Sequence, residues 1–157
     1  MCIRDRPERF ALSLENYFLA DRYRQFSGFF NGEIPKKIGV TDHSLFKSLV
    51  FAKINLSLSD YKDFKKNYDE YVGDDFVFQK VIFLHQPLKK IKQQIKSRGR
   101  PYEQNISPYY LKKIEVGYQN FIQLGLPFRY QKIDLTDLDF VNDERAYQII
   151  LQRIKAF

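Results

Sequence analysis

A short basic segment carries the residue types best suited to binding phosphate. Residues 86–102 contain six cations and no acid, and the last two cations, Arg98 and Arg100, flank Gly99. Guanidinium groups this close suit forked hydrogen bonding to phosphate oxygens. Glu103 follows three residues later, and its carboxylate is able to accept a hydrogen bond from a sugar hydroxyl. The segment predicts a site for a phosphate-bearing small ligand, with a solvated basic helix face as the plainer alternative.

Two further polar residues share one face of an expected helix near the start of the chain. Glu15 and Arg22 lie seven residues apart within residues 7–30, where the apolar residues recur at helical spacing. Seven residues make two turns, so both side chains point the same way. An ionised glutamate offers only acceptors and an arginine only donors. The spacing predicts that the pair shares one helix face, where the plain interpretation is two exposed charges on an ordinary helix.

The expected strand Lys37–Asp42 ends in an acid, and an aromatic residue follows in the next helix. Asp42 ends that strand, at the edge where open α/β sheets place their chemistry. Phe51 follows in the next helix, where core packing is the commoner role of a phenylalanine. A second acidic and aromatic pair, Asp139 and Phe140, follows a later strand. A polar loop anchored by a core phenylalanine explains that pair equally well.

Other enzyme chemistries find little support in the residues. The chain has one cysteine, Cys2, and two histidines, His43 and His85, so we expect no histidine-rich or cysteine-ligated metal site. No Ser-His-Asp order and no glycine-rich dinucleotide loop occurs. We interpret His85, at the end of the run VIFLH, as a strand-end residue rather than a ligand.

The elements that must position these residues alternate between helix and strand. Expected helices span residues 7–30, 44–56, 59–71, 89–96, 107–123 and 143–155, and expected strands span 37–42, 76–85 and 128–134. Ser107 and Pro108 supply an N-cap and a first-turn proline. The run VIFLH predicts a strand buried on both faces. Alternating strands and helices predict an α/β domain with a parallel sheet.

Composition limits the class of protein. The 157 residues suffice for one domain with a core, and 44% of them are hydrophobic. No apolar run reaches the length of a membrane span and no signal-peptide pattern opens the chain, so we expect a cytoplasmic protein that uses no membrane. The net charge of +7 is compatible with binding of a polynucleotide, but a small phosphate-bearing ligand explains a local cluster equally well.

Four segments, in order, resemble the deoxynucleoside kinases in their bacterial form, over nearly all of the chain from about Pro7. They read LENYFLADRYRQ, TDHSLF followed by FA, RGRPYE, and IDLTDLDF. Three positions depart from the family pattern. The family usually has glutamine where this chain has Glu15 and arginine where it has His43, and a further arginine is common at the position of Gln94.

The resemblance implies a P-loop-kinase-type three-layer fold with a parallel sheet, and a role in nucleotide salvage. The implied reaction transfers the γ-phosphoryl group of ATP, as its Mg²⁺ complex, to the 5′-hydroxyl of a deoxyribonucleoside. The implied roles are catalytic for Asp42, Arg98 and Arg100, substrate-binding for Glu15, Arg22, Phe51 and Glu103, and ATP-binding for Asp139 and Phe140. The implied partner is a deoxyribonucleoside rather than a polynucleotide. The preferred base and the oligomeric state stay open, and a homodimer is compatible with the sequence.

One family motif is missing from the sequence. The phosphate loop, G-x-x-x-x-G-K-[ST], occurs nowhere in the 157 residues. Met1–Asp5 reads as the translated end of a common sequencing adapter, so we interpret residues 1–6, with Cys2, as an artefact. We expect residues 7–157 to be a partial kinase domain that lacks the phosphate-loop strand, the second strand and the carboxylate that takes the hydroxyl proton. Such a chain is expected to be inactive alone.

Two alternatives remain. Another P-loop kinase, such as one resembling thymidylate kinase, also has lid arginines, but it would need a monophosphate-binding arginine pattern that residues 14–25 fit less well. A non-enzymatic module that binds nucleic acid would need basic residues spread over one face with interleaved aromatic residues. Here the basic residues concentrate in one segment.

Overall fold

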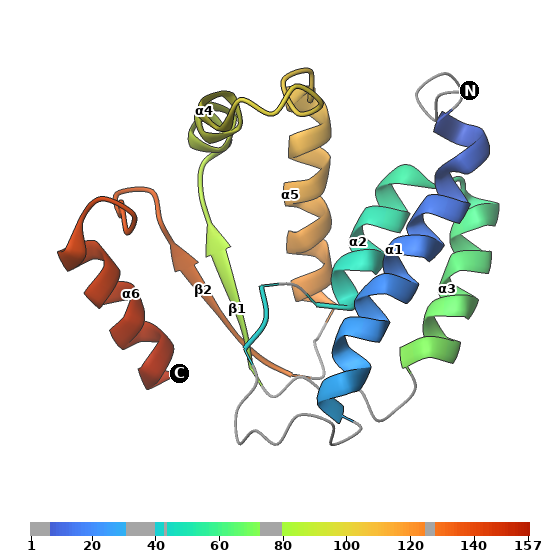
Figure 1. Ribbon diagram of the computed structural model, residues 1–157, viewed down its shortest axis with the longest axis horizontal. Coiled ribbons are helices and arrows are strands. Elements are labelled where there is room, and N and C mark those ends of the chain that lie inside the picture. The colour runs from blue at the N-terminus through green and yellow to red at the C-terminus, as the bar shows by residue number, and fades with distance from the viewer. Residues whose placement is uncertain (1–6, 31–39, 43, 73–79, 125–127) are drawn as a thin grey trace. The chain divides into compact units, whose positions relative to one another are not determined.

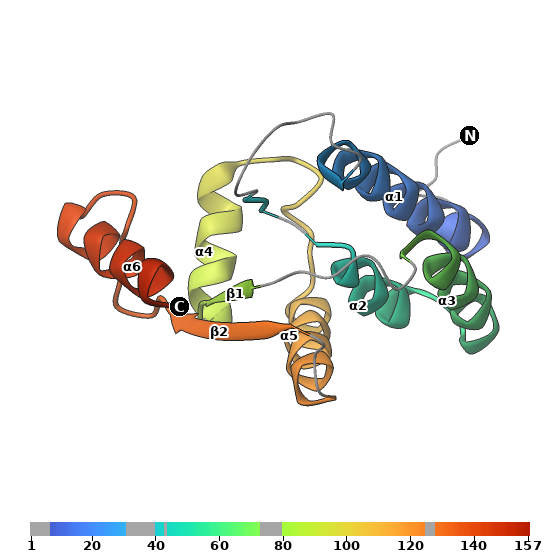
Figure 2. The same cartoon turned by 90° about the horizontal axis from the view of Figure 1, so that it is seen from below.

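A computed structural model describes residues 7–30, 40–42, 44–72, 80–124 and 128–157 of the chain. Contacts within the chain divide it into two compact units, Met1–Phe76 and Val77–Phe157. We call them unit 1 and unit 2. Unit 1 is helical, and unit 2 combines helices with a small sheet (Figures 1 and 2).

Unit 1 consists of three helices that pack against one another. They are α1 (Pro7–Phe30), α2 (Phe46–Asn55) and α3 (Leu58–Val72), and both views show them side by side. All three confirm the helices expected from the sequence. The buried apolar side chains are Leu19, Phe26, Leu45, Phe46, Val50, Ala52 and Phe64. Most of the expected strand Lys37–Asp42 lies outside the described residues, as does His43, and residues 40–42 are irregular chain.

Unit 2 contains two parallel strands joined by a helical crossover. In chain order it has β1 (Lys80–His85), α4 (Leu88–Arg98), α5 (Pro108–Gln123), β2 (Arg129–Asp134) and α6 (Glu144–Ala156). The strands pair in parallel from Lys80 opposite Arg129 to His85 opposite Asp134. This confirms the predicted parallel sheet. It also brings the carboxyl ends of both strands to one edge of the sheet.

Helices cover both faces of this sheet, giving the expected three layers (Figure 1). On one face, Ile133 and Leu135 form a buried core with Ile150 of α6. On the other face, the Phe83 ring meets the Tyr118 ring of α5 edge to face, with centroids 6.2 Å apart. The expectation that β1 is buried on both faces was wrong at Leu84, which is 55% exposed. The apolar core under α6 is centred on β2, at Ile133, rather than on the end of β1.

Local sequence signals set the ends of the helices around the basic segment. α4 ends at Gly99, whose φ of 68° lies in the left-handed region that favours glycine. α5 begins after Ser107, whose Oγ accepts a hydrogen bond from the backbone N–H of Tyr110, with Pro108 as the first helical residue. Among the described residues, no helix is both long and apolar enough to cross a membrane.

Candidate phosphate and nucleoside site

Both arginines of the basic segment converge on one carboxylate. Arg98 Nη2 lies 2.6 Å from Glu103 Oε2, and Arg100 Nη1 lies 3.3 Å from Glu103 Oε1. The Arg98 contact is an ion pair whose geometry falls short of an aligned hydrogen bond, whereas Arg100 donates one. The Glu103 side chain is only 12% exposed, and the arginine side chains are about half exposed. We call these three residues the lid cluster.

The backbone after α4 holds the lid cluster in place. Beyond Gly99 the chain turns, and the Glu103 N–H donates to the Arg100 carbonyl at 3.0 Å. The Gln104 amide donates to the Ile95 carbonyl of α4 at 3.1 Å, which ties the turn back to the helix. The carboxylate is therefore fixed while the two guanidinium groups remain accessible. An anion such as phosphate could compete with Glu103 for both groups.

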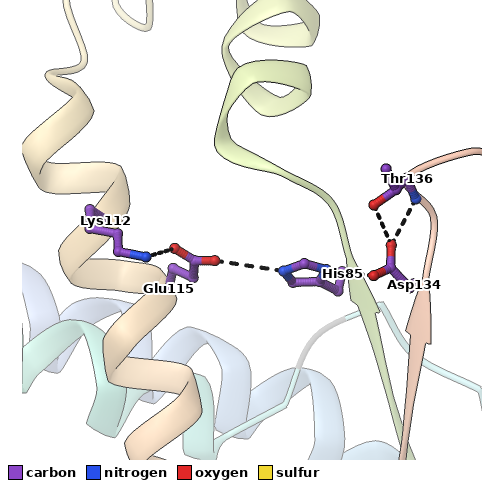
Figure 3. A network of polar contacts seen from close by, with 5 residues as sticks. All are labelled: His85, Lys112, Glu115, Asp134 and Thr136. Carbon is purple, nitrogen blue, oxygen red and sulfur yellow. Dashed lines mark hydrogen bonds and ion pairs between the residues drawn. The ribbon is translucent and has the colours of Figure 1, made fainter.

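A second polar cluster lies at the carboxyl edge of the sheet (Figure 3). His85 points between two carboxylates, with Nε2 3.6 Å from Glu115 of α5 and Nδ1 3.5 Å from Asp134 of β2. Lys112 donates to Glu115 at 2.7 Å, and this hydrogen bond is the main reason that the pKa of Glu115 lies below its ordinary value. Hydrogen bonds from the Thr136 hydroxyl and N–H lower the pKa of Asp134 in the same way.

Sequence reasoning placed His85 correctly at a strand end but missed this cluster. The available signal was that two expected parallel strands both ended in a titratable residue, His85 and Asp134. Sequence reasoning also missed the individual contact that Lys90 makes. Its ammonium group donates to the Thr136 carbonyl and so links α4 to the loop after β2.

Asp139 and Phe140, the acidic and aromatic pair after β2, differ in their local contacts. The Asp139 carboxylate accepts hydrogen bonds from the N–H groups of Val141 and Asn142 and from the Asn142 amide, at 3.0–3.2 Å. The Asn142 contacts are the main cause of the lowered pKa of Asp139. Asp139 thus shapes its own turn. The Phe140 side chain remains available for contact, with an exposed fraction of 37%.

In unit 1, Glu15 and Arg22 both face α2. Glu15 is buried, with an exposed fraction of 5%, and its Oε1 accepts a hydrogen bond from the Asn55 amide at 2.7 Å. Burial raises the pKa of Glu15. Two turns further along α1, Arg22 Nη1 donates a hydrogen bond to the hydroxyl of the buried Ser48 at 2.6 Å. Ser48 and Asn55 are, like Glu15 and Arg22, seven residues apart, and this matched spacing is the signal that sequence reasoning missed.

The remaining predicted residues of unit 1 lie around Lys47. Phe51 is half-buried, and Lys47 Nζ lies 5.7 Å from its ring centroid. Burial lowers the pKa of Lys47, the charge of Arg22 lowers it further, and that of the exposed Asp42 raises it. Lys47 is therefore within electrostatic reach of both a predicted base-reading residue and a predicted catalytic acid.

The described residues contain no group of three histidine, cysteine or acidic side chains that could hold a metal ion. Mg²⁺ in phosphate-transfer sites is commonly held by one or two carboxylates together with substrate phosphates. The lid cluster fits the phosphate part of such a ligand, since it offers two accessible guanidinium groups on a basic segment.

Comparison with known proteins gives consistent results. The sequence model described as deoxynucleoside kinase matches residues 3–157. The chain is 26% identical over 152 residues to a deoxyadenosine/deoxycytidine kinase of Bacillus subtilis, covering 94% of this chain and 70% of that protein. It is 24% identical over 156 residues to a deoxyguanosine kinase of the same organism, covering 96% and 75%.

A solved structure has the same fold as this chain. Deoxyadenosine kinase from M. mycoides, with bound dCTP, superposes with a TM-score of 0.77 at 18% sequence identity. The match covers 99% of this chain and 78% of that one.

Proposed function

Because the chain belongs to the deoxynucleoside kinase family, we propose that its lid cluster stabilises phosphoryl transfer from ATP to a deoxyribonucleoside. In this reaction the 5′-oxygen forms a bond to the γ-phosphorus while the bond from that phosphorus to the β,γ-bridging oxygen breaks and ADP leaves. The 5′-hydroxyl proton passes to the carboxylate that the family supplies upstream of Pro7. Catalysis of this kind depends mostly on positioning and on stabilising charge. The observation that carries the proposal is the convergence of two half-exposed guanidinium groups on one fixed carboxylate.

In the proposed mechanism, Arg98 and Arg100 exchange Glu103 for the phosphate oxygens when ATP binds. Their charges then lie where negative charge develops in the transition state. Glu103, released from one or both arginines, accepts a hydrogen bond from the 3′-hydroxyl of the sugar. The hydrogen bonds that fix its turn to α4 support this role, because a pre-positioned carboxylate needs little reorganisation.

The nucleoside contacts are proposed for unit 1. Glu15 and Arg22 read the edge of the base, and the Phe51 ring stacks on its face. The burial of Glu15 and its hydrogen bond to Asn55 support a recognition role, since a buried carboxylate on an ordinary helix surface would carry a desolvation cost without benefit.

The ATP contacts are proposed for three residues. Phe140 contacts the adenine ring, while Asp139 fixes the turn that presents it. Asp42 would lie near Mg²⁺ when the ion is bound, and the ion would neutralise phosphate charge there. Its electrostatic effect on Lys47 supports a position near other ligand-binding groups. We also propose that the protein acts in the cytoplasm.

The test uses a fusion in which the N-terminal part of the Bacillus subtilis deoxyadenosine/deoxycytidine kinase, through its phosphate loop and second strand, precedes Pro7. We call this fusion the loop-restored enzyme. It is incubated with Mg²⁺-ATP and with deoxynucleosides, thymidine 5′-monophosphate or single-stranded DNA. The expected product is a deoxynucleoside 5′-monophosphate, and the 157-residue chain alone is expected to form none.

The compound that accepts the phosphoryl group distinguishes the proposed function from its two alternatives. Phosphorylation of thymidine monophosphate but of no deoxynucleoside would favour a kinase of the thymidylate type. Salt-dependent DNA binding without phosphorylation of any acceptor would favour a nucleic-acid-binding module. Either result would refute the proposed function.

A further inference from the structure

His85 lies next to both helices that support the lid cluster. It ends β1, and α4 begins at Leu88 and leads directly into the lid cluster. After the lid turn, α5 begins at Pro108, and its Glu115 side chain faces His85 (Figures 1 and 3). A change at His85 can therefore reach the lid cluster through either helix.

Two contacts attach α5 to β1. The rings of Phe83 and Tyr118 meet edge to face, and two residues further along β1, His85 Nε2 lies 3.6 Å from Glu115 Oε1. Residues two apart on a strand, or three apart on a helix, share a face, so both contacts join the same two faces. Glu115 precedes Tyr118 in α5 and is thus the attachment nearer to the lid cluster. Loss of the polar contact leaves the ring contact to hold α5 on the sheet.

Both ring nitrogens of His85 face carboxylates. Nε2 faces Glu115, and Nδ1 lies 3.5 Å from Asp134 Oδ2. Hydrogen bonds from Lys112 and from Thr136 lower the pKa of Glu115 and of Asp134, so both groups are acceptors near neutral pH. A neutral imidazole donates from one nitrogen only, whereas the protonated ring donates from both. Within the part of the chain that the structure describes, the buried Nδ1 has no hydrogen-bond partner, and a short movement towards Asp134 would give it one.

Other contacts hold the two carboxylates in place. The Thr136 hydroxyl and N–H donate to Asp134, and the Lys90 ammonium of α4 donates to the Thr136 carbonyl. Lys112 donates to Glu115 on the other side. The titratable groups around His85 are therefore these two carboxylates, with Lys112 and Lys90 as the next charges. A proton on His85 joins two groups that are already positioned.

We propose that His85 is a positioning residue for phosphoryl transfer, whose protonated ring bridges Glu115 and Asp134 and so holds α5 and the lid cluster against the carboxyl edge of the sheet. The inference rests on the proposed function, in which the lid arginines exchange Glu103 for phosphate oxygens. A fixed support for the lid keeps the guanidinium groups aligned during that exchange. The inference adds a residue outside the proposed contacts with substrate and makes turnover depend on its proton.

The test compares the loop-restored enzyme with its His85→Gln variant by steady-state kinetics between about pH 5 and 8, where histidine side chains change charge. Glutamine has no titratable group, and its amide donates to one carboxylate only. At the acid end, kcat of the variant is expected to be lower by about tenfold or more, because a displaced lid loses transition-state stabilisation. The KM for the nucleoside is expected to change by less than about twofold.

The pH dependence separates positioning from a merely structural role. As the pH rises, His85 of the parent enzyme loses its proton and one side of the bridge, so the ratio of parent kcat to variant kcat should shrink. A merely structural role would lower thermal stability and raise KM, with a ratio that does not depend on pH. Amide hydrogen exchange in the lid turn, residues 99–106, should be faster in the variant, while exchange in α6 stays unchanged.

Two further variants complete the test. Glu115→Gln removes the same bridge from the other side, and it also serves if His85→Gln fails to fold. If His85 acts through Glu115, the double variant should have a kcat within about twofold of the lower single variant rather than the product of both losses. Gln119→Ala, at an exposed residue one turn further along α5, is the matched control and should change neither kcat nor its pH dependence.

The inference and the proposed function fail in different ways. A kcat of His85→Gln within about twofold of the parent across the pH range would overturn the inference. A pH-independent ratio, or losses that multiply in the double variant, would also overturn it, and each of these results leaves the proposed function intact. Failure to phosphorylate any deoxynucleoside would refute the proposed function. Hydrogen exchange then still decides whether His85 holds the lid, and an unchanged exchange rate in the variant would contradict it.

Discussion

Replacing the lid arginines should separate a catalytic loss from a structural one. Arg98→Ala and Arg100→Ala each remove one ion pair with Glu103. Because the two arginine side chains are 50% and 52% exposed, solvent screens both ion pairs and each contributes little to the free energy of unfolding. The folded state of the loop-restored enzyme should therefore tolerate either change.

The effect on turnover should be much larger. A positioned charge that stabilises the transition state is worth about 2.7 kcal/mol or more, which corresponds to a fall in turnover on the order of 100-fold. The interaction forms mainly in the transition state, so the KM for the nucleoside should change little. The two variants should thus show low kcat, a near-normal KM and near-normal stability.

The assay is steady-state kinetics at saturating Mg²⁺-ATP, paired with thermal unfolding of each variant. Arg153→Ala, at an exposed arginine in the last turn of α6, is the matched control and should keep both turnover and stability. The reasoning would be refuted if both lid variants kept turnover within about twofold, a loss under roughly 0.4 kcal/mol. Loss of stability as large as the loss of activity would also contradict it.

Three further predictions concern the stability of the two units, and denaturant or pH titration of unfolding checks them. Phe64→Ala, at a fully buried side chain of α3, should lower the free energy of unfolding by about 3–5 kcal/mol, and an unchanged value would contradict the packing of unit 1. The folded-state pKa of Glu115 is lowered from 4.5. Glu115 therefore stabilises the folded state above pH 4.5, and this stabilisation is lost as pH falls through the folded-state pKa. Glu115→Gln should reduce the fall in the free energy of unfolding at acid pH. Glu15 has the opposite sign, because its folded-state pKa is raised above 4.5 and its contribution is lost as pH rises, so Glu15→Gln should gain stability relative to the parent towards neutral pH.

Local sequence signals predicted most elements of the fold correctly. Ser107 and Pro108 specify the start of α5 because the hydroxyl caps the helix and the proline fits its first turn. The alternation of strands and helices predicted a parallel sheet, and β1 and β2 do pair in parallel. The burial of β1 could not be read from the run VIFLH, because the exposure of Leu84 depends on where α6 packs.

The candidate site was predictable in its residue types but not in its pairings. The spacing of Arg98, Arg100 and Glu103 predicted a phosphate and sugar site, yet the closure of both arginines on Glu103 depends on the turn after Gly99. The contacts of Asn55 with Glu15 and of Ser48 with Arg22 join two helices. Such partners are set by helix packing, which a single sequence does not specify.

The most direct test of the lid assignment is a structure of the loop-restored enzyme with a bisubstrate ligand, in which a deoxyribonucleoside and adenosine are joined through their 5′-oxygens by a phosphate chain. The predicted result has Arg98 and Arg100 within hydrogen-bonding distance, about 2.7–3.2 Å, of phosphate oxygens. Glu103 should then accept a hydrogen bond from the 3′-hydroxyl of the deoxyribose. A bound ligand whose phosphates contact neither arginine, with both still paired to Glu103, would contradict the account.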